Sequence, residues 1–232
     1  MKGLFFTGTN TGVGKTYVAA LVARALVAAG RNVGVYKPVA SSCRRAGDTL
    51  VAEDAELLWQ ATGQNGDFER VCPQRFALAV APPRSALAEG RRVDPELLRT
   101  GLDYWRERCE IVLVEGAGGL MSPLSDADYN IDLARDLGLP LVIVSANELG
   151  TINATLQTLI TARAAAPELP MVGVVLNHPH GNADNSAATN AAELAVRCDV
   201  PLLATVGFQA SQLPADVNWF ALAAKLRLAG DA

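Results

Sequence analysis

The segment that most constrains this chain is a nine-residue run near its start, Gly8-Thr-Asn-Thr-Gly-Val-Gly-Lys-Thr16. An apolar stretch at 4–6 precedes it and an Ala/Val/Leu-rich stretch at 18–29 follows it, which is the strand–loop–helix order of a phosphate-binding loop. Glycines let successive backbone N–H groups turn toward one anion, and the following helix presents its positive end to the same place. The segment therefore predicts a phosphate site in which Lys15 reaches the terminal phosphates and the Thr16 hydroxyl binds Mg²⁺.

The loop differs from the common spacing, in which four residues separate a first glycine from the Gly-Lys-Thr ending. Here five residues separate Gly8 from Gly14, and Thr9 stands where the first glycine usually falls. The alternative interpretation is a glycine-rich turn before a helix. Because the Gly-Lys-Thr ending has the required strand and helix on its two sides, we favour phosphate binding.

The composition suits one soluble α/β domain. The 232 residues are 50% hydrophobic and 19% charged, which is enough for a substantial core. The net charge is −4 and basic residues form no stripe, so we expect no nucleic-acid partner. No apolar run reaches the roughly 18–20 residues that span a bilayer, and no secretory signal is recognised, so we expect a cytoplasmic protein without a membrane partner. Four scattered cysteines and two histidines predict neither a zinc site nor a disulfide framework.

Short apolar runs alternate with longer helical patterns along the chain. The expected strands are 3–7, 33–37, 111–115, 140–145, 171–177 and 201–206, and the expected helices are 15–29, 51–62, 95–108, 131–137, 151–165, 186–198 and 218–228. Several strands are apolar almost throughout, as in sheets that are covered on both faces. The alternation predicts an α/β fold with a mostly parallel sheet flanked by helices. No linker or repeat divides residues 1–232, so we expect a single domain.

Polar side chains stand at the ends of several expected strands, namely Lys15, Lys37, Glu115 and Asn177. Ligands of open parallel sheets bind beyond the carboxyl ends of the strands, so these side chains are expected to converge on one crevice. Glu115 ends an apolar strand and is followed by Gly-Ala-Gly-Gly. This order resembles the second nucleotide-binding motif of P-loop proteins. Its carboxylate can hold Mg²⁺ or a water of the ion, and the alternative is a surface carboxylate before a flexible turn.

Lys37 is a candidate anion clamp. Pro38 biases its backbone toward an extended conformation at the end of a buried strand. A lysine in this position would usually be a solvated strand end, but its place beside the phosphate site favours anion binding. Ser41, four residues later, is a weaker candidate for contact with an amine or a carbonyl oxygen.

Two further candidates lie near expected helix starts. Asp54 stands among acidic residues, which commonly complement the helix dipole, so a metal role is only an alternative for it. The segment Gly150–Asn153 precedes a helix whose free N–H groups suit a carboxylate, and simple helix capping explains it as well. The residues alone leave both questions open.

With these residues assembled, the chain resembles the dethiobiotin synthetases, the ATP-dependent cyclo-ligases of biotin biosynthesis, which have a P-loop NTPase fold. The resemblance covers nearly the whole chain and rests on four ordered motifs, which are Gly8–Thr16, Tyr36-Lys-Pro-Val-Ala-Ser41, Val114-Glu-Gly-Ala-Gly-Gly-Leu120 and Leu149-Gly-Thr-Ile-Asn153. It implies that one amine of 7,8-diaminopelargonic acid captures CO₂, supplied as bicarbonate, to form a carbamate. ATP then phosphorylates the carbamate to a carbamic–phosphoric anhydride, and the second amine closes the ureido ring. The products are dethiobiotin, ADP and phosphate.

The resemblance also implies roles for individual residues. The catalytic residues are Lys37, which binds the carbamate and the transferring phosphoryl group, and Thr11 and Lys15, which hold the γ-phosphate. The implied metal ligands are Thr16, Asp54 and Glu115. The implied contacts to ATP are Gly8, Gly12, Val13, Gly14, Lys15, Thr16, Tyr17, Asp54, Glu115, Gly116, Ala117, Gly118, Asn177, Gly207 and Phe208, with Asn177 reading the adenine.

For the second substrate, the resemblance implies that Ser41 contacts the diamine end. It also implies that a helix start binds the carboxylate tail across the interface of a homodimer. The residues of that helix start are Gly150, Thr151, Ile152 and Asn153.

Three other classes remain as alternatives. Partition and septum-placement ATPases resemble this fold, but they carry an early lysine in the loop where this chain has Asn10. Cobyrinic-acid-type synthetases share the nucleotide domain and add a glutaminase domain, for which this chain is too short. The third class is a nucleotide-binding interaction module without chemistry.

Overall fold

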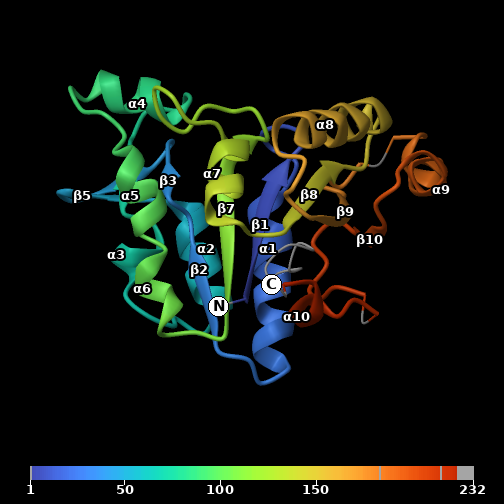
Figure 1. Cartoon of the computed structure of the whole chain (residues 1–232), viewed down its shortest axis with the longest axis horizontal. Coiled ribbons are helices and arrows are strands. Elements are labelled where there is room, and N and C mark those ends of the chain that lie inside the picture. The colour runs from blue at the N-terminus through green and yellow to red at the C-terminus, as the bar shows by residue number, and fades with distance from the viewer. Residues whose placement is uncertain (1, 183, 215, 224–232) are drawn as a thin grey trace.

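The computed structural model describes residues 2–182, 184–214 and 216–223, and its centre is a sheet of six parallel strands (Figure 1). The strand order across the sheet is β10-β9-β8-β1-β7-β2. The bounds are Lys2–Gly8 for β1, Val33–Tyr36 for β2, Ile111–Gly119 for β7, Leu141–Ala146 for β8, Met171–Asn177 for β9 and Leu202–Val206 for β10. Because each neighbouring pair is parallel, the carboxyl ends of the strands meet at one edge.

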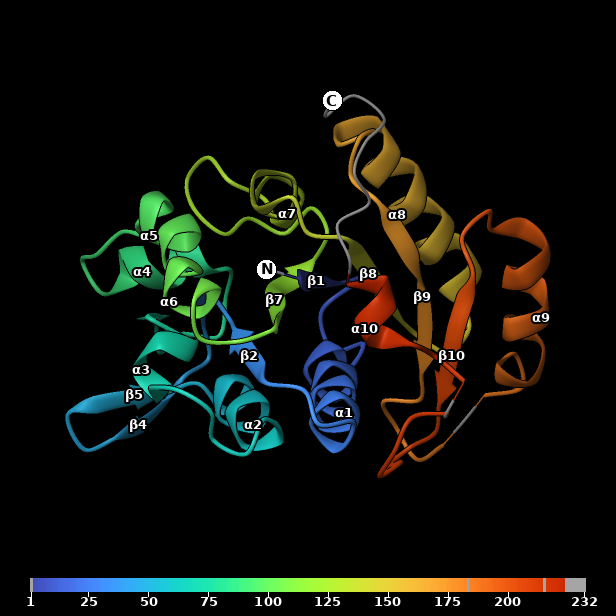
Figure 2. The ribbon, with the colours of Figure 1, turned by 60° about the horizontal axis from the view of Figure 1, so that its bottom comes forward.

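Helices cover both faces of this sheet (Figure 2). Helices α1 (Lys15–Ala28) and α2 (Glu53–Ala61) lie on one face, and α7 (Asn130–Leu137) and α8 (Thr151–Ala165) lie on the other. Helix α9 (Ala187–Arg197) packs beside β10 at the sheet edge. Within the described ranges, no helix is long and apolar enough to cross a membrane. The expected α/β fold with a parallel, helix-flanked sheet is therefore confirmed.

A group of short helices and strands lies beyond β2 (Figures 1 and 2). The sequence patterns predict few of these elements. Each contains too few residues for a periodic pattern to be recognised. They are β3 (Val39–Ala40), β4 (Arg44–Ala46), β5 (Thr49–Val51), α3 (Phe68–Val71), β6 (Gln74–Arg75), α4 (Pro82–Ala88), α5 (Pro95–Thr100) and α6 (Asp103–Arg106).

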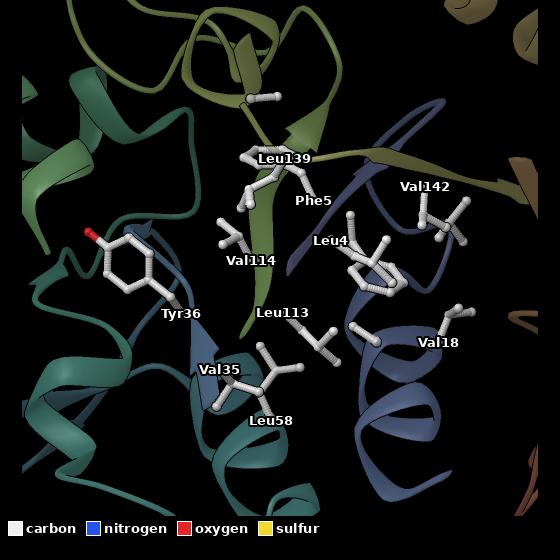
Figure 3. Close-up of a cluster of buried hydrophobic side chains, with 14 of the residues drawn as sticks. Leu4, Phe5, Val18, Val35, Tyr36, Leu58, Leu113, Val114, Leu139 and Val142 are labelled. Carbon is white, nitrogen blue, oxygen red and sulfur yellow. The ribbon is translucent and has the colours of Figure 1, made fainter. Parts of the chain in front are cut away.

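The core is made by the continuous apolar strands together with the inner sides of the helices (Figure 3). Phe5, Val35 and Leu113 come from three neighbouring strands, and Val18 and Leu58 come from α1 and α2; none is more than 1% exposed. Complete burial of such a side chain stabilises a protein by about 1.5–3 kcal/mol. This packing fixes the strands whose ends carry the candidate site.

The expected helix at 95–108 is wrong, because the segment forms two short helices, α5 and α6. The Tyr36 hydroxyl donates to the carbonyl oxygens of Leu97 and Leu98, at 2.8 and 3.2 Å. The Leu98 carbonyl is thereby taken by a side chain, and the Leu102 N–H bonds to the Arg99 carbonyl instead. A tertiary contact thus interrupts a sequence that favours one helix.

Two other helix boundaries also differ. The helix expected at 51–62 begins at Glu53, because Val51 pairs with Arg44 in the β4–β5 hairpin. Of the helix expected at 218–228, the described residues form α10 at Trp219–Leu222, and residues 224–228 lie outside the described part of the chain.

Candidate functional site

The loop between β1 and α1 has the backbone shape that its glycines predict. Gly12 and Gly14 have φ values of +79° and +85°, and α1 begins directly after Gly14, at Lys15. A side chain at Gly14 is also excluded sterically, since an added Cβ would lie 2.2 Å from the Asn177 amide nitrogen. That nitrogen donates a 3.0 Å hydrogen bond to the Val13 carbonyl. The end of β9 therefore supports the loop from behind.

A cavity of about 500 Å³ opens at the carboxyl edge of the sheet, in front of this loop. It brings together residues from the β1–α1 loop, the start of α1, the segment that follows β2, α2 and β7. Twelve of the predicted site residues line it: Thr11, Gly12, Gly14, Lys15, Thr16, Tyr17, Lys37, Ser41, Asp54, Glu115, Ala117 and Gly118. The convergence expected from the strand ends therefore holds for the two lysines and Glu115.

The polar centre of the cavity is a buried cation between two carboxylates. Lys37 Nζ lies 2.7 Å from Glu115 Oε1 and 3.0 Å from Asp54 Oδ2. The Lys37 and Glu115 side chains are only 3% and 2% exposed, whereas that of Asp54 is 55% exposed. The Thr16 hydroxyl donates to Glu115 Oε1 at 2.8 Å. Thr16 and Lys37, which are far from Glu115 in the sequence, thus both contact its carboxylate, and Asp54 joins the group through Lys37.

The surroundings set the charges of these groups. Burial alone would lower the pKa of Lys37, but the Glu115 and Asp54 carboxylates outweigh it and hold that pKa above its ordinary value. The same ammonium group lowers the pKa of Asp54. Burial lowers the pKa of Lys15 despite the nearby Glu115. The cavity therefore holds a firmly charged lysine beside a second lysine whose positive charge is destabilised by burial.

The donor set fits a hard cation such as Mg²⁺. Mg²⁺ binds oxygen ligands, and Thr16, Asp54 and Glu115 place a hydroxyl and two carboxylates side by side. Glu115 Oε2 is buried and has no hydrogen-bond partner among the described residues. An unpartnered buried carboxylate oxygen is costly, and a bound cation would satisfy it. The described residues contain no cluster of three His, Cys, Asp or Glu side chains of the kind that forms a closed protein metal site.

A second cavity of about 310 Å³ adjoins the first and was missed by the sequence reasoning. The two cavities share Thr11, Ser41, Ser42, Ala117 and Gly118. The rest of its wall is formed by residues Ala79–Pro82, Ser122 and Pro123. In the sequence, the Pro82-Pro83 pair marks the start of α4, which contributes Pro82 to this wall.

The remaining predicted residues line neither cavity. Gly150 has a φ of +97° and precedes α8, and the Thr151 N–H and hydroxyl bond to the Glu148 carbonyl and to Ser145 Oγ. Asn177 is 1% exposed behind the loop, with its Oδ1 lacking a partner among the described residues. The others are Gly8, Val13, Gly116, Ile152, Asn153, Gly207 and Phe208.

Comparison with solved structures shows the fold. The 54 kDa protein of the signal recognition particle from Aeropyrum pernix, in complex with GDP, aligns with a TM-score of 0.54 and 17% identity. The signal recognition particle receptor FtsY from Elizabethkingia anophelis aligns with a TM-score of 0.50 and 15% identity. The alignments cover 92% and 88% of this chain but only 43% and 58% of those longer chains.

Comparison with sequences shows the family. A family model described as an AAA domain matches residues 2–210. ATP-dependent dethiobiotin synthetase BioD from Rhodopirellula baltica is 41% identical over 218 residues, which cover 89% of this chain and 84% of that protein. The protein of the same name from Aromatoleum aromaticum is 36% identical over 99% of this chain and 98% of its own length. The one from Aquifex aeolicus is 36% identical over 93% of each chain. With three of the four motifs represented around one cavity, this similarity means that the chain belongs to the ATP-dependent dethiobiotin synthetase family.

Proposed function

We propose that this chain is the ligase that converts 7,8-diaminopelargonic acid, CO₂ and ATP into dethiobiotin, ADP and phosphate. Family membership supports the overall reaction. At the site itself, the proposal rests on one observation. A phosphate-binding loop, the buried Lys37 and a second adjoining cavity lie together. A single domain of residues 1–232 would perform all of the steps.

The β1–α1 loop would hold the ATP phosphates. Its backbone and the positive end of α1 suit a polyanion, and Lys15 and Thr11 line the cavity where the γ-phosphate would lie. Burial already destabilises the charge of Lys15, so an anionic phosphate would be a strong partner for it. At the other end of ATP, Asn177, Gly207 and Phe208 are proposed to contact the base, with the unpartnered Asn177 Oδ1 accepting from the adenine amine.

The adjoining cavity would hold the diamine. Thr11, Ser41 and Gly118 belong to both cavities, so a carbamate formed there would face the γ-phosphate across a short shared wall. Lys37 is proposed to bind this carbamate and the transferring phosphoryl group, because both carry negative charge that must be brought together. Closure of the ring then requires only that the second amine reaches the activated carbonyl carbon and that phosphate leaves.

Thr16, Asp54 and Glu115 are proposed to hold Mg²⁺. When bound, the ion would neutralise phosphate charge and help to orient the γ-phosphate for transfer. Lys37 Nζ lies 2.7 Å from the Glu115 carboxylate and 3.0 Å from that of Asp54. The two carboxylates therefore already stabilise one positive charge beside the proposed ion site. Each carboxylate would then be shared between the ion and the lysine.

Replacing Asp54 with asparagine tests the metal assignment. The side chain is about half exposed, so the variant should fold normally, but the Mg²⁺ concentration for half-maximal rate should rise by about tenfold or more. Glu53→Gln is the matched control, since Glu53 is the adjacent and more exposed carboxylate of the same helix. An unchanged Mg²⁺ requirement in Asp54→Asn would remove Asp54 from the metal site.

The carboxylate tail of the substrate would be held by a partner subunit in a cytoplasmic homodimer. The tail lies several methylenes from the reacting amines, and the Gly150–Asn153 helix start lines neither cavity of its own chain. The N–H groups of a helix start, with its positive dipole end, suit a carboxylate. Shared sites of this kind would make the dimer the active unit.

Mixing two inactive variants tests the shared site. Lys37→Gln and Gly150→Trp should each be inactive alone, whereas a heterodimer has one site with both lesions and one with neither. A two-fold symmetric dimer at random exchange should therefore recover roughly a quarter of the wild-type rate. Native mass spectrometry verifies that subunits exchange. Heterodimers without recovered activity would mean that the tail binds within one chain.

The dependence of ADP release on the second substrate tests the function against the ATPase-switch alternative. Wild-type protein with ATP and Mg²⁺ should release ADP rapidly only when diaminopelargonic acid and bicarbonate are both present. A rate that is indifferent to the diamine would contradict the proposal and favour a switch.

A further inference from the structure

The carboxyl end of β7 is bulged where it forms the wall of both cavities. Phe6 pairs with Glu115, but Gly8, only two residues later on β1, pairs with Gly119. The intervening residues 116–118 of β7 therefore leave the regular ladder, as in a β-bulge. This irregular stretch points Ala117 and Gly118 into the region that the two cavities share.

Asn130, the first residue of α7, holds this bulge. Its side chain is fully buried, and Nδ2 lies 2.7 Å from the carbonyl oxygens of both Ala117 and Gly119 and 3.2 Å from that of Ser122. A bulge removes backbone carbonyls from the sheet ladder, and buried carbonyls without donors are costly. The Asn130 amide supplies the donors that the strand has lost.

The fit between Asn130 and the bulge leaves no room for a side chain at Gly116. An added Cβ there would lie 2.0 Å from Asn130 Oδ1. Gly118 is similarly constrained, because its φ is +76° and an added Cβ would lie 2.4 Å from Ser122 Oγ. Two glycines of the Glu-Gly-Ala-Gly-Gly motif, Gly116 and Gly118, are thus required by the packing of Asn130 and Ser122.

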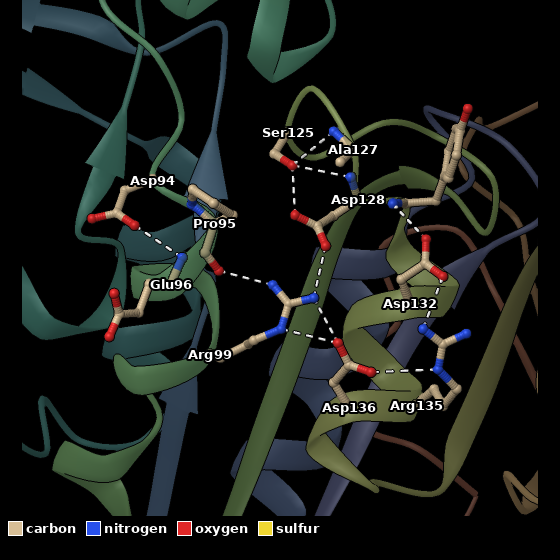
Figure 4. A network of polar contacts seen from close by, with 11 residues as sticks. Asp94, Pro95, Glu96, Arg99, Ser125, Ala127, Asp128, Asp132, Arg135 and Asp136 are labelled. Carbon is tan, nitrogen blue, oxygen red and sulfur yellow. Dashed lines mark hydrogen bonds and ion pairs between the residues drawn. The ribbon is translucent and has the colours of Figure 1, made fainter.

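Asn130 is itself held in place through its helix. The Arg99 guanidinium of α5 binds Asp136 on α7 through Nε and Nη2, at 2.9 and 2.6 Å, and Asp128 at 2.7 Å (Figure 4). The Asn130 N–H also donates to the Ser122 carbonyl at 3.3 Å. A rigid helix start therefore presents the amide to the bulge.

We infer that Asn130 is a positioning residue of the reaction. It lines neither cavity, and it acts by fixing the Gly116–Gly119 backbone that forms the wall between the nucleotide and the second substrate. The kinetic effects that we expect from changes at Asn130 rest on the proposed function. The structural part of the inference, the dependence of the bulge on the Asn130 amide, can be measured without any activity.

Asn130→Asp is the sharpest variant. It keeps the shape of the side chain but replaces the N–H donors with a carboxylate oxygen that faces the same carbonyl oxygens. We expect kcat to fall by about 10–100-fold, the scale of a displacement of about 1 Å in a reacting geometry. Because Ala117 and Gly118 line both cavities, the KM values for ATP and for diaminopelargonic acid should both rise. A kcat within twofold of wild type with both KM values unchanged would overturn the inference.

Asn65→Ala is the matched control. Asn65 also donates its amide to a backbone carbonyl, that of Val33, but it lies at the amino end of β2, away from both cavities. Its loss should lower stability and leave kcat and both KM values unchanged. A kinetic loss equal to that of Asn130→Asp would show that the Asn130 effect is only general destabilisation.

A double-variant cycle and hydrogen exchange complete the test. Gly116→Ala should lower kcat strongly in the wild-type background and much less in Asn130→Ala, where the facing amide is absent. In Asn130→Ala the backbone amides of 116–122 should exchange about tenfold faster, while those of 8–16 stay unchanged. Unchanged exchange at 116–122 would overturn the inference even if the protein made no dethiobiotin. Normal wild-type exchange with no product would instead contradict only the proposed function.

Discussion

Replacing Lys37 with glutamine is expected to lower kcat by about 10²–10³-fold, the scale of one lost electrostatic donor in a dry site. Lys37 is 3% exposed on its side chain, and two carboxylates hold it in its charged form. Glutamine keeps a hydrogen-bond donor and removes the charge that the carbamate and phosphoryl group are proposed to need. Steady-state kinetics at saturating ATP, diamine and bicarbonate measure the effect.

Lys2→Gln provides the control for Lys37→Gln. Lys2 begins β1, the strand that leads into the phosphate-binding loop, but its ammonium group contacts the Phe220 carbonyl, and it lines neither cavity. Its replacement should leave kcat within twofold of wild type. A near-normal kcat in folded Lys37→Gln would end the proposed role of Lys37 as an anion clamp.

Replacing Glu115 with glutamine should have the second large effect, on stability as well as turnover. Breaking a buried ion pair by removing one charge typically costs about 3–5 kcal/mol, and the lower end is expected because Asp54 still pairs with Lys37. Turnover should also fall by more than about 10²-fold if a metal ligand is lost. Denaturant unfolding and steady-state kinetics measure the two effects separately.

The double variant Lys37→Met/Glu115→Gln distinguishes the two contributions. Removing both charges leaves Lys15 and Asp54 as one cation and one anion in the cavity, so stability should return to within about 1 kcal/mol of wild type. Turnover should nevertheless stay lost, because the proposed clamp and metal ligand are both absent. A double variant as unstable as Glu115→Gln would show that Glu115 does not stabilise the protein through its ion pair with Lys37.

The central sheet and the convergence of the two lysines with Glu115 could be predicted because they depend on local patterns. Apolar runs specify buried parallel strands, and a parallel sheet brings the ends of those strands to one edge. Lys37 and Glu115 end such runs, and they lie 2.7 Å apart in the structure. Asp54 could be placed beside them only through the resemblance. Its position near a helix start is explained equally well by an acidic residue that complements the helix dipole.

The features that escaped prediction all depend on contacts between distant segments. The break between α5 and α6 depends on the Tyr36 hydroxyl, more than sixty residues earlier in the chain. The bulge of β7 depends on an amide from α7, and the glycines of the motif give no indication of that partner. The second cavity is lined by short segments around Ser41, Pro82 and Ser122, none of which has a periodic pattern.

Formation of dethiobiotin from ¹³C-bicarbonate tests the central claim most directly. Purified protein with diaminopelargonic acid, ATP, Mg²⁺ and the labelled bicarbonate is followed by mass spectrometry, with Lys37→Gln in parallel. The account predicts dethiobiotin that carries one ¹³C atom in its ureido carbon, formed together with one ADP, and almost none from Lys37→Gln. ADP release without labelled dethiobiotin, or equal product from the Lys37→Gln variant, would contradict it.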